Sequence, residues 1–391
     1  MKILFVINNM YVRGNGLDAS TRRTVHELKA AGEDVRVLSA CDPSKPGQHP
    51  EFPLKIYKFP FFQPIIEANG YSYANGDPKV IEEAVRWADV VHLQEAFVLQ
   101  LKTVRIAQRL GKPLTASFHI FPENIFGSLG MKNWRWANET LLKVWRNRIY
   151  NACSIIQCPT ERVRERLQKN GFQSELRVIS NGLIPETCLR PATPPADYED
   201  PARPLEVVCI GRLAGEKDQI TLIRAMRHSQ FARRIHLTFA GNGPQAKKIQ
   251  RKANKLYRDG ILGYEPSFVF LSHDDLRRLA AKADLCVHCA IIEIEGLSIM
   301  EAMQQAAVPV IADGPYTGSS QFALDARSLF PARDAKALAA RIDDWLARPQ
   351  ERWEAGWHYA ESVKPYNIAY STEKLIAMFR DTLNAKAADT E

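Results

Sequence analysis

Two glutamates on either side of a glycine turn are the residues best suited to bind a ligand. Glu293 precedes Gly296, and Glu301 lies one to two turns into the helix pattern that starts at Leu297. Glycine lets the backbone approach a ligand closely, and the free amides of Leu297 and Ser298 at a helix start attract negative charge. An anion between two acceptors of hydroxyl hydrogen bonds suits a nucleotide sugar. The alternative is two solvated glutamates on an ordinary strand-to-helix connection.

Two cations follow another strand pattern, at residues 205–211. Arg212 and Lys217 lie on either side of a short glycine-containing turn, before a helix pattern that starts near residue 219. Arginine can bind phosphate oxygens through two parallel hydrogen bonds, and lysine adds a point charge. We therefore expect a diphosphate clamp, although a solvated basic loop has the same composition. The next strand pattern ends in the tight turn Gly241-Asn-Gly-Pro, which contains Gly243.

The N-terminal half carries two further candidates. His119 ends the strand pattern 113–119, and ligands of open α/β sheets bind beyond the carboxyl ends of the strands. Gly14-Asn-Gly16 follows the first strand pattern and could bring backbone amides to a phosphate at a helix start. The alternatives are a histidine that hydrogen-bonds to nearby backbone and a plain turn.

The elements that must position these residues alternate between strand and helix. Residues 2–7 read as a buried parallel strand, followed by a glycine loop, a helix at 18–31 and a strand at 34–39. Strand patterns also occur at 54–59, 89–93, 113–119, 154–159 and 176–180, and in the second half at 205–211, 235–240, 268–271, 285–289 and 308–312. Strands that alternate with helices indicate a mostly parallel sheet. The sequence therefore predicts an α/β protein with two doubly wound, Rossmann-like domains.

Proline marks the predicted boundary between the domains. Six prolines lie between residues 185 and 204, a density that fits neither a helix interior nor a central strand. We expect an acceptor-binding domain at 1–182, a linker at 183–204 and a nucleotide-sugar-binding domain at 205–365. Residues 366–391 should form a C-terminal helix that packs back on the first domain.

Composition and charge limit the class of protein. The chain has 391 residues, a net charge of +8 and a pI of about 9.0, which allows an anionic partner. Seven scattered cysteines indicate a reducing compartment. The apolar start is too short for a signal peptide, and no run reaches the ~20 apolar residues of a membrane span. We expect a cytoplasmic location, and peripheral contact with the inner face of a membrane is a further hypothesis.

Residues 131–150 predict a helix with two faces. Trp134, Leu141, Trp145 and Ile149 recur at helical spacing. Four basic residues fall largely elsewhere: Lys132, Arg135, Lys143 and Arg146. Tryptophans beside basic residues resemble a helix that lies on an anionic bilayer. The alternative is an amphipathic helix whose tryptophans pack into the domain core.

Several other functions find no support in the sequence. Cys286-Val-His-Cys289 lacks a second pair at zinc spacing, so we predict no metal site. The chain has no GxxxxGK[ST] loop and no GxSxG elbow, which argues against a P-loop NTPase and a serine hydrolase. Its positive charge is spread along the chain without an RNA- or DNA-binding motif, so we expect no nucleic-acid partner.

With these residues identified, the chain resembles the GT-B glycosyltransferases of family GT4. The resemblance rests on Gly211-Arg-Leu with Lys217, on Gly241-Asn-Gly-Pro, and on the Glu-x7-Glu pattern from Glu293 to Glu301. Val178-Ile-Ser-Asn-Gly matches the segment that closes the first domain of that family. Within the family the chain looks most like bacterial diacylglycerol glucosyltransferases, through residues 87–93, 118–125 and 321–325.

The resemblance implies a retaining transfer of a hexose from a nucleotide sugar, with UDP as the expected nucleotide and with no metal or other cofactor. Arg212 and Lys217 would hold the diphosphate and stabilise the leaving nucleotide. Glu301 would bind the ribose hydroxyls and Glu293 the hydroxyls of the donor sugar, with the amides of Leu297 and Ser298 beside the phosphate.

By the same resemblance, His119 would lie near the reacting carbon, and Gly16 would belong to a loop over the phosphates. Gly243 and Gly296 join the donor-binding set. The chain departs from the family pattern at Ile294-Glu295, where the family usually has Gly-Phe, which leaves the donor sugar open. The acceptor would be a membrane lipid such as diacylglycerol. The alternatives are a saccharide or small-molecule acceptor, and a sugar-nucleotide-binding or nucleic-acid-binding protein without catalysis.

Overall fold

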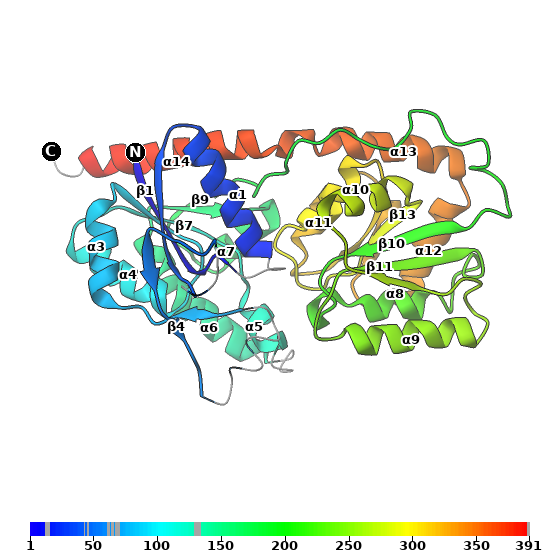
Figure 1. Ribbon diagram of the computed structural model, residues 1–391, viewed down its shortest axis with the longest axis horizontal. Coiled ribbons are helices and arrows are strands. Elements are labelled where there is room, and N and C mark those ends of the chain that lie inside the picture. Colours follow the sequence, from blue (N-terminus) through cyan, green and yellow to red (C-terminus); the bar gives the residue numbers. More distant parts are fainter. Residues whose placement is uncertain are drawn as a thin grey trace. The chain divides into compact units, whose positions relative to one another are not determined.

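The computed structural model of this protein forms two compact units (Figure 1). The first contains residues 1–182 and 368–391, and the second contains residues 183–367. The structure describes residues 1–11, 16–42, 44, 47–60, 63, 66, 71–128 and 134–388.

The first unit is built on a seven-stranded parallel sheet with the order β3-β2-β1-β6-β7-β8-β9. Its strands are β1 (Lys2–Asn9), β2 (Asp34–Ala40), β3 (Phe52–Leu54), β6 (Val90–Leu93), β7 (Leu114–Ser117), β8 (Ile155–Cys158) and β9 (Glu175–Val178). Its helices include α1 (Gly16–Ala30), α3 (Pro78–Trp87), α4 (Val98–Arg109), α5 (Pro122–Ser128), α6 (Arg135–Arg148), α7 (Glu161–Lys169) and α14 (Ile368–Ala388). The direction of winding reverses between β1 and β6.

One predicted strand of this unit is wrong. Residues 54–59 do not form a single strand, because β3 ends at Leu54 and β4 (Ile56–Tyr57) pairs antiparallel with β5 (Tyr73–Ala74) in a separate sheet. Proline cannot donate a ladder hydrogen bond, and Pro53 accordingly lies in the edge strand β3. Beyond it the chain leaves the sheet, and Phe59 contacts the rings of Tyr57 and Tyr73 edge-on, at centroid distances of 4.8 and 5.2 Å.

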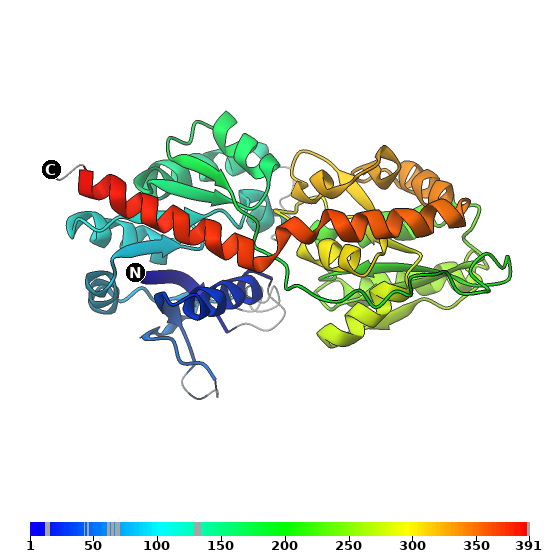
Figure 2. The ribbon, with the colours of Figure 1, turned by 90° about the horizontal axis from the view of Figure 1, so that it is seen from above.

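The C-terminal helix completes the core of the first unit. Figure 2 shows α14, in red, lying across the strands of this unit. Leu375, Met378 and Phe379 of α14 are buried against Phe5 of β1 and its neighbours. Burial of each such side chain contributes ~1.5–3 kcal/mol, so we expect the first unit to depend on the end of the chain.

The second unit is built on a six-stranded parallel sheet with the order β12-β11-β10-β13-β14-β15. Its strands are β10 (Leu205–Ile210), β11 (Ile235–Ala240), β12 (Ser267–Val269), β13 (Leu285–His288), β14 (Val308–Asp313) and β15 (Leu329–Pro331). Its helices include α8 (Gln219–Ala225), α9 (Ala246–Arg258), α10 (His273–Lys282), α11 (Leu297–Gln304), α12 (Ala335–Leu346) and α13 (Pro349–Ser362). Winding reverses between β10 and β13. Both units are doubly wound, which confirms the predicted α/β fold class.

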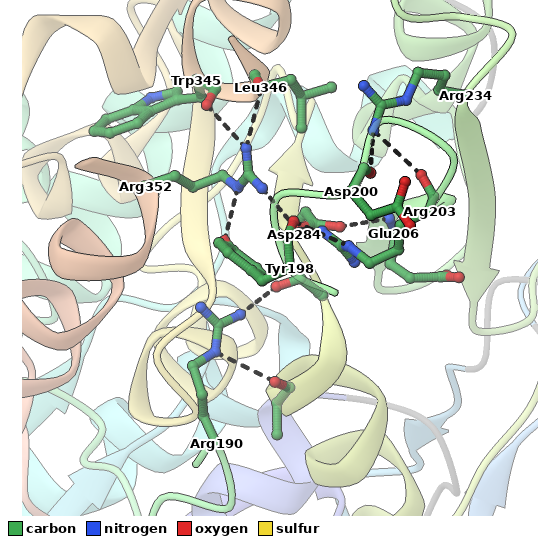
Figure 3. Close-up of polar contacts among 12 residues, drawn as sticks. Arg190, Tyr198, Asp200, Arg203, Glu206, Arg234, Asp284, Trp345, Leu346 and Arg352 are labelled. Carbon is green, nitrogen blue, oxygen red and sulfur yellow. Dashed lines mark hydrogen bonds and ion pairs between the residues drawn. The ribbon is translucent and has the colours of Figure 1, made fainter. Parts of the chain in front are cut away.

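A buried ion pair lies at the amino ends of β10 and β13 in the second unit (Figure 3). Nη2 of Arg352 donates to Oδ1 of Asp284 at 2.9 Å, and both side chains are 1% exposed. The backbone amide of Glu206, in β10, donates to the other oxygen of Asp284 at 2.8 Å. Because breaking a buried pair leaves a charge unpaired in the interior, this pair ties α13 to the sheet.

The proline-rich segment 183–204 is anchored to the same place. Arg203 donates to Asp284 at 2.7 Å, and the hydroxyl of Tyr198 accepts from Arg352 at 3.1 Å. Arg190 donates to the carbonyls of Ala281 and Ala283. The segment predicted as a linker therefore packs on the second unit, and the chain crosses between the units after residues 182 and 367.

Candidate functional site

The carboxyl edge of the second sheet brings together residues that are far apart in the sequence. Lys217 follows β10, whereas His288 ends β13 and Glu293 follows it. β10 and β13 are neighbours at the point where the winding reverses. Loops that leave such a pair diverge to opposite faces of the sheet, and this is where open α/β sheets bind ligands.

One carboxylate oxygen joins these three side chains. Nζ of Lys217 donates to Oε2 of Glu293 in a short contact, and Nε2 of His288 lies 3.0 Å from the same oxygen. Because an ionised carboxylate only accepts hydrogen bonds, Nε2 of His288 carries a proton. Lys217 and Glu293 are 21% and 14% exposed at their side chains, so a ligand that enters from solvent can reach both.

The charge state of Glu293 follows from these contacts. Burial by itself would raise its pKa, but the charge of Lys217 and the hydrogen bond from His288 outweigh burial and hold the pKa well below its usual range. Glu293 is therefore ionised at neutral pH. It is an acceptor for hydroxyl groups and also the present counter-ion of the cation predicted to bind phosphate.

The backbone around Glu293 is fixed on both sides. Its amide donates to the carbonyl of Tyr316 at 2.8 Å, and its carbonyl accepts from Gly318 at 2.7 Å. Gly296 follows with φ of 96°, a left-handed conformation that favours glycine. A Cβ at Gly296 would also lie 2.8 Å from Cβ of Ser319. No other residue fits this turn without a shift of the loop after β14.

Helix α11 begins at this turn. Ile299 donates to the carbonyl of Gly296 at 3.0 Å, so the amides of Leu297 and Ser298 precede the first turn of intrahelical bonds. Oγ of Ser298 donates to the carbonyl of Ile210 at 3.4 Å, which holds the start of α11 against the end of β10. Glu301 lies further along α11 and is half-buried. That Glu301 shares a ligand with Glu293 remains a prediction.

Arg212 is held by a carboxylate of its own loop. Its Nη2 donates to Oε1 of Glu216 in a short contact, and its carbonyl accepts from Gln219 at 2.9 Å. The carbonyl of Glu216 in turn accepts from the amide of Ile291 at 2.8 Å. The loop with the two cations is thus tied to the loop that leads to Glu293.

The glycines of the 241–244 turn have a structural explanation. A Cβ at Gly243 would lie 2.5 Å from the carbonyl oxygen of Leu213, and a Cβ at Gly241 would lie 2.1 Å from that of Gly211. The amide of Leu213 also donates to Asn242 at 2.9 Å. Gly243, predicted to bind the donor, lets two backbone segments pack closely beside Arg212.

The first unit contains the other two predicted site residues. Nε2 of His119 lies 3.2 Å from Oε1 of Gln94, which also accepts from Thr21 at 3.1 Å. Since this oxygen is an acceptor, His119 carries its proton on Nε2. Burial lowers the pKa of His119 to about 4, so the ring is neutral at physiological pH. Gly16 is the first residue of α1, whereas residues 14 and 15 lie outside the described residues.

A buried carboxylate in the same unit was not among the predicted site residues. Glu95 follows β6 and accepts from the amide of Asn8 at 2.8 Å, from its side chain at 2.6 Å, and from Gln100 at 3.2 Å. Burial raises its pKa to about 7 despite these bonds. His288, the partner of Glu293, was not predicted either. Glu95 follows β6 and His288 ends β13. Their position at the carboxyl ends of strands is the feature of the sequence from which both could have been predicted.

Helix α6 combines the two alternatives considered for residues 131–150. Trp145 and Ile149 are buried in the unit, as expected of core positions. Trp134 and Trp136 are 47% and 68% exposed, and their rings stack at a centroid distance of 5.9 Å. Residues 131–133 lie outside the described part of the chain.

The described helices include none with the length and apolar character needed to cross a membrane. No group of three or more described His, Cys, Asp or Glu side chains could hold a metal ion.

Two family models match this chain. The model described as Glycosyltransferase Family 4 matches residues 14–187, and the model described as Glycosyl transferases group 1 matches residues 195–356. Together they cover most of both units.

Named relatives and solved structures agree with these matches. An alpha-monoglucosyldiacylglycerol synthase of Streptococcus pneumoniae is 23% identical over 81% of this chain and 72% of its own length. A GDP-mannose-dependent alpha-mannosyltransferase of Corynebacterium glutamicum is 26% identical over 98% of this chain and 89% of its own length. The structure of Anabaena HepE in complex with UDP-glucose is 17% identical and covers 98% of this chain and all of its own, with a TM-score of 0.69. This likeness identifies the fold.

Proposed function

Because this chain belongs to family GT4 of the GT-B glycosyltransferases, we propose that it moves a hexose from a UDP-sugar to an acceptor hydroxyl with retention of configuration. The cluster of Lys217, His288 and Glu293 at the reversal of the second sheet carries this proposal. It combines a cation for the diphosphate with an ionised acceptor for sugar hydroxyls within one hydrogen-bonded group.

Charge stabilisation at the diphosphate is the central step of the proposed mechanism. As the glycosidic bond breaks, negative charge grows on the departing diphosphate. Lys217 and Arg212, both held by carboxylates, would be attracted to that charge, and the amides of Leu297 and Ser298 would add fixed dipoles. Such preorganised groups usually supply the largest single part of the rate enhancement.

The remaining predicted residues would orient the sugar. Glu293 would accept hydrogen bonds from the donor hydroxyls, and Glu301 from the ribose. A neutral His119 would lie near the reacting carbon without repelling the positive charge that develops on the sugar ring. Its lowered pKa supports this role.

We propose a membrane lipid such as diacylglycerol as the acceptor, reached at an anionic membrane surface through residues 131–150. The name of the S. pneumoniae relative supports this choice, as do the exposed rings of Trp134 and Trp136. Tryptophan favours the membrane interface, where its ring is partly buried and its N–H stays hydrated.

A second candidate donor is GDP-mannose, which the name of the C. glutamicum relative favours. Residues 294 and 295 are Ile and Glu, where the family usually has Gly and Phe. They directly follow Glu293, the proposed sugar-binding carboxylate, so this difference can change which donor sugar is accepted. A saccharide acceptor remains the alternative to a lipid.

Transfer assays test these proposals directly. The purified protein is incubated with labelled UDP-glucose or GDP-mannose, with diacylglycerol vesicles or a soluble saccharide, and the anomeric configuration of the product is determined by NMR. Lys217→Ala should lower turnover roughly 100- to 1,000-fold, the effect of removing one preorganised donor. Lys282→Ala, at an exposed site on α10, is the control. Transfer that proceeds equally well in both variants would rule out the proposed role of Lys217.

A further inference from the structure

Helix α9 concentrates positive charge on one surface of the second unit. Its thirteen residues include six cations and no acidic residue: Lys247, Lys248, Arg251, Lys252, Lys255 and Arg258. The whole chain has a net charge of +8, so this short helix carries a charge comparable to that of the entire protein. All six residues are exposed.

The charged face is held outward by the packing of the helix. Ile249, Ala253 and Leu256 are buried in the core of the second unit. Figure 1 shows α8 and α9 on one face of the sheet and α10 and α11 on the other. The helix is therefore a fixed part of the unit, and its cations form a rigid row about 20 Å long.

Few of these charges are neutralised within the protein. Lys255 lies 3.2 Å from Asp259, which also lies 3.5 Å from Arg227. No carboxylate in the described part of the chain forms an ion pair with the other five cations. Concentrated positive charge without internal partners indicates an external anionic partner.

A groove of about 450 Å³ runs along this helix. Its lining combines cations, amides and one aromatic ring: Lys247, Gln250, Arg251, Asn254, Tyr257, Arg258 and Glu265. The groove thus offers several cations and side-chain amides to a phosphate.

We propose that this basic face of α9 docks the second unit on the anionic surface of a lipid bilayer, with a phosphate headgroup in the groove. A bilayer presents many phosphates in one plane, so a straight row of cations can be matched along its whole length. Proteins that bind single-stranded nucleic acid combine a basic groove with aromatic rings on which successive bases stack, whereas Tyr257 is the one aromatic residue in the lining of this groove. The choice of a bilayer among anionic partners rests on the proposed lipid acceptor.

Vesicle binding by the full chain tests this inference. Vesicles of phosphatidylcholine, with and without phosphatidylglycerol, are sedimented with the wild type and with a triple variant, Lys247→Gln, Arg251→Gln and Arg258→Gln. Each basic residue near an anionic surface is worth about a factor of five in partitioning, so the triple variant should bind anionic vesicles roughly 100-fold more weakly. Added salt should weaken binding of the wild type.

Matched variants separate a local effect from net charge. Lys282→Gln, Lys336→Gln and Lys374→Gln remove the same total charge from exposed positions outside α9 and should lower binding much less. The reciprocal exchange Lys247→Arg, Arg251→Lys and Arg258→Lys should retain it. Equal loss in both glutamine triples, equal binding to neutral vesicles, or tighter binding to RNA or duplex DNA than to anionic vesicles would overturn the proposal.

Affinity for UDP in solution distinguishes this inference from the proposed function. The α9 variants should bind UDP as the wild type does, because their residues lie outside the Lys217 cluster. A wild-type chain that binds anionic vesicles through α9 but transfers no sugar would refute the proposed function and leave the docking surface intact. Transfer by a chain whose α9 variants bind vesicles normally would do the reverse.

Discussion

The ion pair between Lys217 and Glu293 makes a prediction that separates nucleotide binding from sugar transfer. Without ligand, the cation assigned to the diphosphate is occupied by the carboxylate assigned to the sugar. Glu293→Gln keeps the shape of the side chain and one carbonyl acceptor but removes the charge. Lys217 is then freed of its counter-ion, and we expect the variant to bind UDP more tightly than the wild type while it transfers sugar more slowly.

The size of both effects follows from the environment of the pair. Two unit charges 4 Å apart interact by about 1 kcal/mol in water and about 4 kcal/mol at an effective dielectric constant of 20. The two side chains are 21% and 14% exposed, between these conditions, so we take about 2 kcal/mol, or roughly 30-fold in the Kd for UDP. Loss of a charged hydrogen bond to the sugar costs ~1.5–3 kcal/mol, which corresponds to roughly 10- to 100-fold in turnover.

Isothermal titration with UDP and a transfer assay with the full nucleotide sugar measure the two quantities on the same protein. Glu206→Gln is the matched control, because Glu206 pairs with His236 at 2.9 Å at the start of β10, the opposite edge of the same sheet. The control should change neither UDP affinity nor turnover.

The outcomes are distinct. Weaker UDP binding by Glu293→Gln would mean that the carboxylate supports the cation rather than competes with the diphosphate. Unchanged turnover would remove Glu293 from sugar binding. Either result would refute the division of roles proposed for this cluster.

Three further changes test the framework around the site. Asp284→Asn leaves Arg352 buried without its counter-charge and should lower the free energy of unfolding in urea by ~3–5 kcal/mol; an unchanged urea midpoint would contradict this. Burial raises the pKa of Glu95 from 4.5 to about 7 and thus favours its neutral form in the folded state, so the wild type should lose about 3 kcal/mol between pH 4.5 and pH 7. Glu95→Gln should not show this loss, and its Tm relative to the wild type should rise from pH 5 to pH 8; a constant difference would refute the assignment. Gly243→Ala brings a Cβ within 2.5 Å of the carbonyl oxygen of Leu213 and should lower both Tm and UDP affinity, at a cost of ~1–3 kcal/mol. An unchanged Tm and an unchanged Kd for UDP would show that alanine fits at this position.

Local pattern was sufficient to predict the fold class. Residues 3–7 are all buried, and 205–211 are buried or half-buried, because a parallel sheet covered on both faces has no solvent side. The same reasoning was wrong at 54–59, where Tyr57 and Phe59 contact other aromatic rings and do not extend the parallel sheet. A pattern of apolar residues indicates which side chains pack against other parts of the protein. It does not identify the element against which they pack.

Helix α6 shows the same limit on one segment. Spacing alone placed Trp134 and Trp145 on a common apolar face. Only packing decided that Trp145 is 5% exposed and that Trp134, which precedes the first turn of the helix, is 47% exposed.

The sequence by itself determined the residue types of the site. Arg212, Lys217 and Glu293 were chosen for charge and for their position after strands, and that position is local information. The tertiary structure alone decided that Lys217 and Glu293, 76 residues apart, form an ion pair joined by His288. The physical reason is topological: two strands distant in sequence become neighbours where the winding of the sheet reverses, and only there do their loops supply opposite charges to the same place.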